Sequence, residues 1–332
     1  MITGGLGYIG SHICAELIKP EFEIVVIDNL SNSSKDVIER IKTITNQAFK
    51  FYEVDIRDKN ELRKIFDTYN FSSVIHLAGL KSVSDSIQSP LKYFDNNVNG
   101  TLSLLEVMEE NKCYEFIFSS SATVYGVPES LPIREDLNVS PNNPYGEGKV
   151  MCEKILNDIS LSNPNWKIGI LRYFNPIGAH PSGLIGENPN GTPNNLLPYV
   201  TMVAYGELEC VNVFGDDYPT PDGSGVRDYI HVVDLAKAHV KMLEKLSSLK
   251  EPINIFNIGT GEGFSVLEII STFERISGRE IPYKIVPRRH GDIAECFADA
   301  TLANKYLGWY AENTLEEMIL STCSWMENKK QL

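Results

Sequence analysis

Three glycines at the start of the chain constrain the fold more than any other feature. They stand at positions 4, 7 and 10 and form a Gly-x-x-Gly-x-x-Gly pattern. Glycine lets the backbone approach a pyrophosphate closely, and the N-terminus of a following helix offers free N–H groups and a positive dipole. The pattern predicts a dinucleotide-binding loop that enters a helix reaching about Lys19.

The next apolar run supports this interpretation. Residues 23–28 predict a buried strand that ends in the acid Asp28. An acid about 20 residues after such a loop can bind both hydroxyls of an adenosine ribose, and it would repel a 2′-phosphate. We therefore expect NAD rather than NADP. The alternative is that Asp28 only forms the turn after the strand.

The strand before the glycines is short, because only Met1 and Ile2 precede Thr3. Strands usually have about five or six residues. We interpret the short start as a trimmed chain or a misassigned start. We expect about four added apolar residues to raise the thermal stability, since a central parallel strand is buried on both faces.

Strands and helices then alternate, which predicts an α/β fold with a parallel sheet. The expected strands cover 50–54, 73–79, 115–118, 166–173, 210–214, 254–259 and 283–285, and the expected helices cover 59–69, 90–111, 144–161, 197–205, 233–246, 266–277 and 315–326.

A change in composition divides the chain, because residues 174–225 are rich in Pro, Gly and Asn. We expect a doubly wound parallel sheet of the Rossmann type over residues 1–175. A smaller C-terminal substrate-binding domain should follow over 176–332, with about 229–259 packing back on the first domain.

Charge and cysteine usage exclude several classes of function. The formal net charge of −14 argues against nucleic acid and anionic membranes as partners. The six cysteines are scattered without a Cys-x-x-Cys pair, which is typical of reduced thiols in a cytoplasmic protein. His231 and His239 lack the spacing of metal ligands. We expect a cytoplasmic protein with no metal, and we see no membrane span or signal peptide.

The candidate catalytic residues begin with three serines at positions 119–121. They follow the predicted strand 115–118 and should lie at its carboxyl end, where open α/β sheets bind ligands. Downstream, Pro144 suits the first position of a helix, with Asn143 or Asn142 as its cap.

Tyr145 and Lys149 are then one turn apart on the same helix face. An ammonium beside a phenol favours the phenolate. Tyr145 is therefore our candidate general base, although its pKa must fall by roughly three units for work near pH 7. An ordinary surface helix is the alternative interpretation.

Three further polar residues have a structural and a functional interpretation. Asn96 and Asn99 lie among apolar residues of the predicted helix 90–111, where asparagine is a poor helix former. They would contact the cofactor or brace a loop, and the alternative is that they face solvent. We expect His76 to be a hydrogen-bonded histidine of its strand.

Long motifs resemble a known family. The glycine loop, Asp28, the serine strand and the Tyr-x-x-x-Lys pair are similar to those of the extended short-chain dehydrogenase/reductases. Residues 118–126, 172–183 and 225–231 are most similar to the members that epimerise UDP-glucose and UDP-galactose at C4, and the similarity covers essentially the whole chain. The resemblance implies NAD, a UDP-sugar substrate, a role in galactose metabolism and a homodimer built on helices 90–111 and 144–161.

The resemblance also implies roles for individual residues. Tyr145 would take the proton of the sugar 4-hydroxyl, Ser121 would bridge Tyr145 and the sugar oxygen, and Lys149 would lower the pKa of the phenol. The implied cofactor contacts are Gly4, Gly7, Tyr8, Ile9, Gly10, Asp28, Asn29, Leu30, Ser31, Asn32, Ser33, Asp55, Ile56, Leu77, Ala78, Gly79, Lys81, Asn96, Ser119, Tyr145, Lys149 and Phe174. The implied substrate contacts are Lys81, Ser121, Tyr145, Asn175, Asn195, Leu196, Asn212, Phe214, Arg227, Arg289, Asp292 and Cys296.

Two arginines reconcile an acidic chain with an anionic ligand. Arg227 and Arg289 would be the local positive charges that hold a diphosphate. The alternative interpretation is that both are surface arginines that face solvent.

Cys296 bears on the substrate range. Family members with a bulky Tyr at this position resemble enzymes that are restricted to UDP-glucose and UDP-galactose. Since cysteine is small, we expect UDP-N-acetylglucosamine and UDP-N-acetylgalactosamine to be interconverted as well. The alternative is a buried filler whose neighbours close the gap.

Three other functions share parts of this pattern. The pattern of the sugar-nucleotide 4,6-dehydratases has an Asp-Glu pair after the active-site Thr or Ser. This chain has Ala122 and Thr123 at those positions. A 4-keto reductase would release its cofactor at each turnover. A non-catalytic NAD-binding regulator would not need Tyr145 and Lys149.

Overall fold

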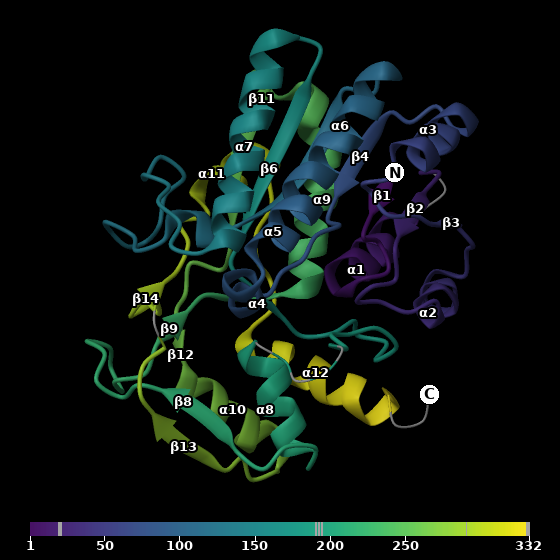
Figure 1. Ribbon diagram of the computed structural model, residues 1–332. Helices are drawn as coiled ribbons and strands as arrows, with labels where there is room; N and C mark the ends of the chain where they lie inside the picture. The colour runs from purple at the N-terminus through teal and green to yellow at the C-terminus, as the bar shows by residue number, and fades with distance from the viewer. Residues whose placement is uncertain (19–21, 190, 192, 194, 290, 330–332) are drawn as a thin grey trace.

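The computed structural model describes residues 1–18, 22–189, 191, 193, 195–289 and 291–329. Within these ranges the largest element is a sheet of seven parallel strands (Figure 1). Their order across the sheet is β11 (Ile253–Ile258), β6 (Lys167–Tyr173), β5 (Glu115–Ser121), β4 (Ser73–His76), β1 (Ile2–Thr3), β2 (Val25–Asp28) and β3 (Lys50–Glu53). This is the doubly wound order with one added strand, so the predicted fold class is confirmed.

The central strands are apolar because both of their faces are covered. All four residues of β2 are buried, as are six of the seven residues of β6. β1 has only two residues, yet it pairs on both sides, with Ile2 opposite Val26 of β2 and opposite Ile75 of β4.

Helices cover both faces of the sheet. One hydrophobic core lies between the sheet and α1 (Tyr8–Leu17), α2 (Asp36–Thr45), α9 (Val232–Lys245) and α11 (Thr301–Leu307). The other core lies between the sheet and α3 (Lys59–Thr68), α6 (Gly100–Glu110) and α7 (Pro144–Ser162). The chain changes face between β1 and β4, which creates the switch point where such sheets bind ligands.

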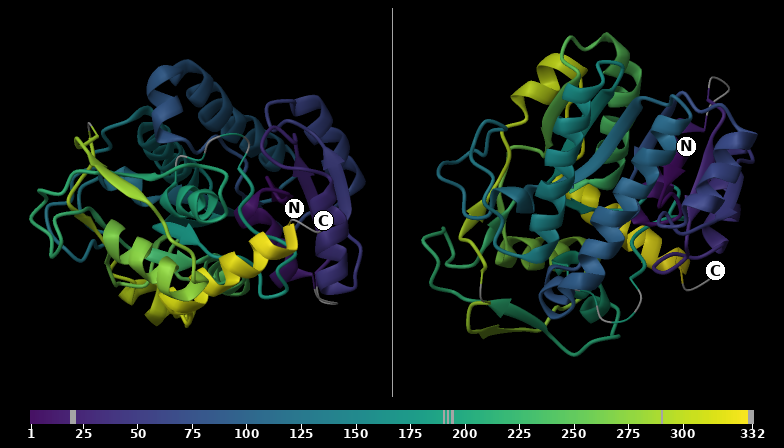
Figure 2. Two further views of the ribbon diagram at one scale, coloured as in Figure 1. Left: turned by 90° about the horizontal axis from the view of Figure 1, so that it is seen from below. Right: turned by 45° about the horizontal axis from the view of Figure 1, so that its top comes forward.

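The remaining elements form a second body below the sheet (Figure 1). Its strands pair as β7 (Asn175–Ile177) with β10 (Tyr229–His231), β8 (Val211–Phe214) with β13 (Tyr283–Val286), and β9 (Val226–Arg227) with both β12 (Phe264–Ser265) and β14 (Glu295–Cys296). Its helices are α8 (Leu196–Ala204), α10 (Val266–Ser277) and α12 (Leu315–Lys329), which share a third core. The view from below shows α12 packed along α10 (Figure 2).

The helix predicted over 90–111 is interrupted. It consists of α5 (Pro90–Tyr93), a π-helical turn (Phe94–Asn99) and α6. Inside that turn the buried amide of Asn97 donates to the carbonyl of Leu80 at 2.9 Å and accepts from its N–H at 2.8 Å. Such turns are frequent at functional sites, and this one fixes the loop after β4.

Several short helices escaped the sequence analysis, namely α2, α4 (Val83–Gln88) and α11. The helix expected to reach Lys19 ends at Leu17, and Lys19 itself lies outside the described residues. No helix within the described ranges is long and apolar enough to cross a membrane.

Candidate active site

The glycine loop forms a cradle at the N-terminus of α1. Gly4 has a φ of 67°, and a Cβ there would lie 2.8 Å from the nitrogen of Ala78. A Cβ on Gly10 would lie 2.2 Å from the oxygen of Gly4. The first turn of α1 has neither a side-chain cap nor an acidic residue. Its free N–H groups and close backbone packing therefore fit a diphosphate such as that of NAD.

Asp28 at the end of β2 binds the loops around it. Its carboxylate accepts from the N–H of Leu6 at 3.1 Å, from the N–H of Leu30 at 2.9 Å and from the hydroxyl of Ser33 at 2.8 Å. It thus shapes both the glycine loop and the segment 28–33, in which Ser31 and Asn32 are exposed. The turn-forming role is observed, and the ribose-binding role remains a prediction.

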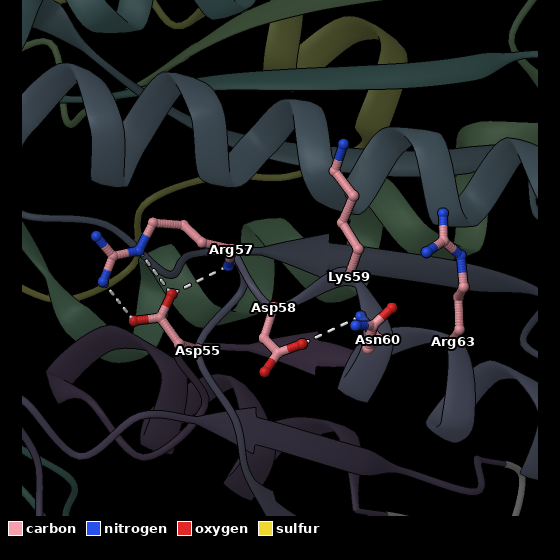
Figure 3. A pocket seen from close by; sticks show the side chains of 6 residues that line it. All are labelled: Asp55, Arg57, Asp58, Lys59, Asn60 and Arg63. Carbon is pink, nitrogen blue, oxygen red and sulfur yellow. Dashed lines mark hydrogen bonds and ion pairs between the residues drawn. The ribbon is translucent and has the colours of Figure 1, made fainter.

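Asp55 lies beside this segment in an open pocket after β3 (Figure 3). Arg57 holds it with a two-pronged ion pair at 2.9 and 2.8 Å, and the amide of Asn29 donates to it at 3.0 Å. These bonds hold the pKa of the Asp55 carboxyl well below its usual range. Lys59 and Arg63 point to Glu106 and Glu110 of α6, so the basic residues of this pocket are already paired.

The end of β4 approaches the glycine loop directly. The hydroxyl of Thr3 accepts from the N–H groups of Leu77 and Ala78, each at 3.2 Å. His76 bonds to the hydroxyls of Thr3 and Thr101 through its two ring nitrogens, so the expected hydrogen-bonded strand histidine is confirmed. The loop after β4 is braced by Asn97 and not by Asn96 or Asn99, the two asparagines that the sequence pointed to. Asn96 is half-buried, and Asn99 bonds to exposed Asp95.

Ser121, Tyr145 and Lys149 gather at the carboxyl end of β5. The oxygen of the Asn143 side chain accepts from the N–H of Gly146 at 2.9 Å, so Asn143 caps α7 as predicted. Ser121 lies next to the Tyr145 phenol, and its hydroxyl oxygen accepts from the N–H of Thr123 at 3.2 Å and from the hydroxyl of Thr123 at 3.0 Å. The Lys149 nitrogen lies 5.8 Å from the centroid of the Tyr145 ring.

Burial of Tyr145 opposes ionisation of its phenol. Burial raises the pKa of its phenol to about 12, and the neighbouring Ser121 hydroxyl only partly opposes the rise. The ammonium of Lys149 donates to the carbonyl of Ser119 at 2.6 Å instead of to the phenol. The contacts that Lys149 makes therefore do not offset the effect of burial on the Tyr145 phenol, and the role of Tyr145 as the general base remains a prediction.

Lys149 is itself 7% exposed. Burial lowers the pKa of its ammonium to about 8, although nearby Cys152 and Glu153 oppose the decrease. It therefore remains mostly charged at pH 7.

Most of the residues predicted to contact the substrate lie in the second body or at its edge. Arg289 pairs with Asp292 at 2.9 Å and its guanidinium lies 4.5 Å from the ring centroid of Phe214. Arg227 donates to the carbonyl of its neighbour Val226 at 2.8 Å. Asn175 and Asn195 are exposed, and Leu196 begins α8. The buried side-chain oxygen of Asn212 has no hydrogen-bond partner among the described residues, which suits a group that awaits a ligand.

Cys296 lies where the two bodies meet. It is 8% exposed and packs in a cluster with Phe174, Val124 and Tyr125. In the sheet formed by β9 and β14 it stands opposite Arg227. The expected cofactor residue Phe174 and the expected substrate residue Cys296 are thus in one cluster.

Two residues of the site were not found from the sequence. Asn97 braces the loop before Lys81, and Glu187 accepts from the ammonium of Lys81 at 2.6 Å. The two contacts join residues that are 17 and 106 positions apart in the sequence, so no local pattern indicates them. Among the described residues no group of three or more His, Cys, Asp or Glu side chains could hold a metal ion.

The sheet order, the glycine cradle at its switch point and the Ser–Tyr–Lys group together define an extended short-chain dehydrogenase/reductase. The family model described as GDP-mannose 4,6 dehydratase matches residues 1–322. A curated UDP-glucose 4-epimerase of Bacillus subtilis is 53% identical over 328 residues, covering 99% of this chain and 96% of the relative.

Solved structures agree with that assignment. A UDP-glucose 4-epimerase from Bifidobacterium longum in complex with NAD+ and UDP is 49% identical with a TM-score of 0.95, covering 99% of this chain and 98% of that one. A UDP-glucose 4-epimerase from Stenotrophomonas maltophila with bound NAD and formylated UDP-arabinopyranose is 47% identical with a TM-score of 0.97 and the same coverage. The chain belongs to the UDP-glucose 4-epimerase family.

Proposed function

We propose that this chain is an NAD-dependent epimerase that inverts C4 of UDP-hexoses and so interconverts UDP-galactose and UDP-glucose through a transient 4-keto sugar. The observation that carries the proposal is that Ser121, Tyr145 and Lys149 gather at the carboxyl end of β5, where the Lys149 ammonium bonds to the carbonyl of Ser119 and lies 5.8 Å from the Tyr145 ring centroid. It stands in a chain about half identical to epimerases over its full length.

Tyr145 is the group that exchanges the proton of the sugar 4-hydroxyl. When bound, oxidised NAD would accept the hydride and would add a positive charge to the site. That charge and the ammonium of Lys149 together favour the phenolate that burial alone disfavours. Ser121 lies next to the phenol and would contact the same sugar oxygen. The free N–H groups of α1 hold the cofactor diphosphate.

The UDP moiety is held by cations that now pair within the protein. Arg289 is bonded to Asp292, and Lys81 is bonded to Glu187. A bound diphosphate offers several charged oxygens to Arg289, Lys81 and Arg227. Such local positive charge overcomes the repulsion expected from a net charge of −14.

Several finer assignments belong to this proposal. Residues 1–175 are the NAD-binding domain and residues 176–332 the UDP-sugar domain, with 229–259 packing back on the first. The enzyme works in the cytoplasm on galactose metabolism, which suits its six free thiols. The range extends to the N-acetylated UDP-sugars because Cys296 is small.

We also propose a homodimer. The faces of α4, α5 and α7 leave Ile87, Leu91 and Met151 at 58%, 82% and 43% exposure, and these helices pack against one another. An apolar surface of this kind suits a protein interface. Light scattering should give twice the chain mass for the parent and the single chain mass for Leu91→Asp.

The competing functions are less well supported. Ala122 and Thr123 leave no acid after Ser121 for elimination of water, as a dehydratase requires. A non-catalytic NAD sensor would not explain a buried lysine beside Tyr145 and Ser121.

The direct experiment compares the parent with Tyr145→Phe. The purified parent should interconvert UDP-galactose and UDP-glucose without added cofactor. Tyr145→Phe should retain NAD and lose at least about a hundredfold in kcat, the scale of general-base loss. Tyr114→Phe, which packs on Trp166 away from the site, is the matched control. A Tyr145→Phe enzyme with near-normal kcat would refute the assignment.

A further inference from the structure

The backbone of Glu187 is held firmly between β7 and α8. Just before it, Ala179 and Gly186 form a β-bridge, and the indole N–H of Trp325 donates to the carbonyl of Glu187 at 3.2 Å. A Cβ on Gly186 would lie 2.6 Å from the Trp325 ring, so only glycine allows this approach. Helix α12 therefore fixes where the Glu187 side chain starts.

The carboxylate of Glu187 joins the two bodies of the molecule. One of its oxygens accepts from the ammonium of Lys81 at 2.6 Å and from the amide of Asn195 at 3.4 Å. Lys81 follows β4 of the large sheet, and Asn195 precedes α8 of the second body. Both are predicted to contact the UDP-sugar, whereas nothing so far assigns a role to Glu187.

The opposite side of Lys81 is also fixed. Asn97 bonds to both backbone groups of Leu80, the residue before Lys81. The Lys81 ammonium lies 6.0 Å from the ring centroid of Tyr8, whose hydroxyl donates to the carbonyl of Gly178 at 2.6 Å. The ammonium thus has a defined place between the glycine loop and the segment that carries Glu187.

Burial distinguishes this ion pair from an ordinary surface pair. Exposed pairs contribute little, because water screens them and the side chains lose freedom. The Glu187 side chain is 11% exposed, while that of Lys81 is 47% exposed. A carboxylate so covered needs hydrogen-bond donors, and Lys81 and Asn195 are the donors to it among the described residues.

We infer that Glu187 is a positioning residue: it orients Lys81 and Asn195 for the UDP-sugar and so ties the second body to the loop after β4 of the large sheet. The inference rests on the proposed function for its substrate. A carboxylate that acted only by repelling the phosphates would have the opposite effect. Removal of its charge would then tighten UDP binding, which makes the sign of the effect decisive.

The test is a double-mutant cycle of Glu187→Gln and Lys81→Met, measured on the full chain with NAD bound. UDP affinity is measured by calorimetry, and KM and kcat with UDP-galactose. We expect Glu187→Gln to weaken UDP binding and raise KM about five- to tenfold, the scale of one ordinary hydrogen bond, with kcat changed less than about twofold. In the Lys81→Met background the same substitution should change UDP affinity less than about twofold, because the two residues act together.

Glu207→Gln is the matched control, since Glu207 lines the same cavity of about 360 Å³ but is exposed and forms no ion pair with a described residue. It removes the same charge and should leave UDP affinity unchanged. If Glu187→Gln does not fold, the same cycle is run with Glu187→Asp, which keeps the charge and shortens the reach. Tighter binding, unchanged binding, or an equal effect in both backgrounds would overturn the inference. Because UDP affinity does not depend on turnover, a parent that binds UDP but converts no sugar would refute the proposed function separately.

Discussion

The ammonium of Lys149 and the carbonyl oxygen of Ser119 are 2.6 Å apart, and this bond ties α7 to the end of β5. It sets the face of α7 that carries Tyr145 against the strand that carries Ser121. The same bond takes the ammonium away from the phenol, which explains why the lysine does not by itself lower the pKa of Tyr145. Lys149 therefore acts first by positioning α7 against β5, and second through its charge.

Replacement of Lys149 by Met should move the pH dependence of kcat. Tyr145 acts as a base, so activity rises with pH through the pKa of its phenol. Loss of the nearby positive charge raises that pKa, and the acid limb of the profile should move to higher pH. The check is kcat against pH for parent and mutant at saturating UDP-galactose. An active mutant with an unchanged profile would show that the charge has no part in the ionisation.

Neutralisation of Asp28 should change which dinucleotide is retained. Asp28→Asn keeps an acceptor for the N–H of Leu30 but removes the negative charge. We expect less NAD in the purified protein and weaker rejection of NADP, because a 2′-phosphate no longer meets an acid. Asp36→Asn, an exposed acid at the start of α2, is the control for charge alone. Equal NAD content and equal NADP rejection in Asp28→Asn would leave Asp28 as a turn residue only.

The prediction from sequence succeeded where a pattern is local. The buried strands are continuous apolar runs, and the cap Asn143 with Pro144 marks the start of α7. Helix α2 was missed although Val37, Ile38 and Ile41 pack in the core at helical spacing. The π-helical turn depends on the contact of Asn97 with Leu80, which no neighbouring residue indicates.

The same limit applies to the site. Tyr145 and Lys149 could be paired from a spacing of four residues, and the glycine loop from a spacing of three. The partner of Lys81 is Glu187, 106 residues away, and only the fold brings them together. The high pKa of Tyr145 likewise follows from burial by distant segments. The division near residue 175 and the individual roles of the site residues stay predictions.

Substitution of Cys296 by Tyr should narrow the substrate range. The cysteine is packed beside Phe174 and opposite Arg227, so an aromatic ring there must occupy space on the substrate side. We expect the parent to interconvert the N-acetylated pair. In Cys296→Tyr this activity should fall by more than the roughly 10- to 200-fold discrimination that one methylene group provides. Activity on UDP-galactose should persist. Inactivity of the parent on the acetylated pair would refute the wider pocket, and a Tyr mutant that kept this activity would place the gate elsewhere.

Buried histidines should make the fold sensitive to acid. Burial lowers the pKa of His76 and of His12 to about 3, and that of His231 and of His239 to about 4. An unfolded histidine titrates near 6.5, so below that pH the unfolded chain binds protons that the folded chain does not. Stability is therefore full above about pH 6.5 and falls towards pH 4, by up to about 1.4 kcal/mol per pH unit for each such histidine.

Urea unfolding at pH 7 and pH 5 measures this loss. The midpoint should be clearly lower at pH 5, and His76→Gln should show a smaller difference between the two values. Equal midpoints at pH 7 and pH 5 in the parent would contradict the account.

The fate of hydrogen at C4 tests the central claim most directly. UDP-galactose that carries deuterium at C4 is incubated in ordinary water with the purified protein and no added cofactor, and the product is examined by NMR and mass spectrometry. If C4 passes hydride to tightly held NAD and takes it back on the other face, UDP-glucose should retain the deuterium at C4. Product that has exchanged its deuterium for solvent hydrogen would contradict the proposed 4-keto mechanism.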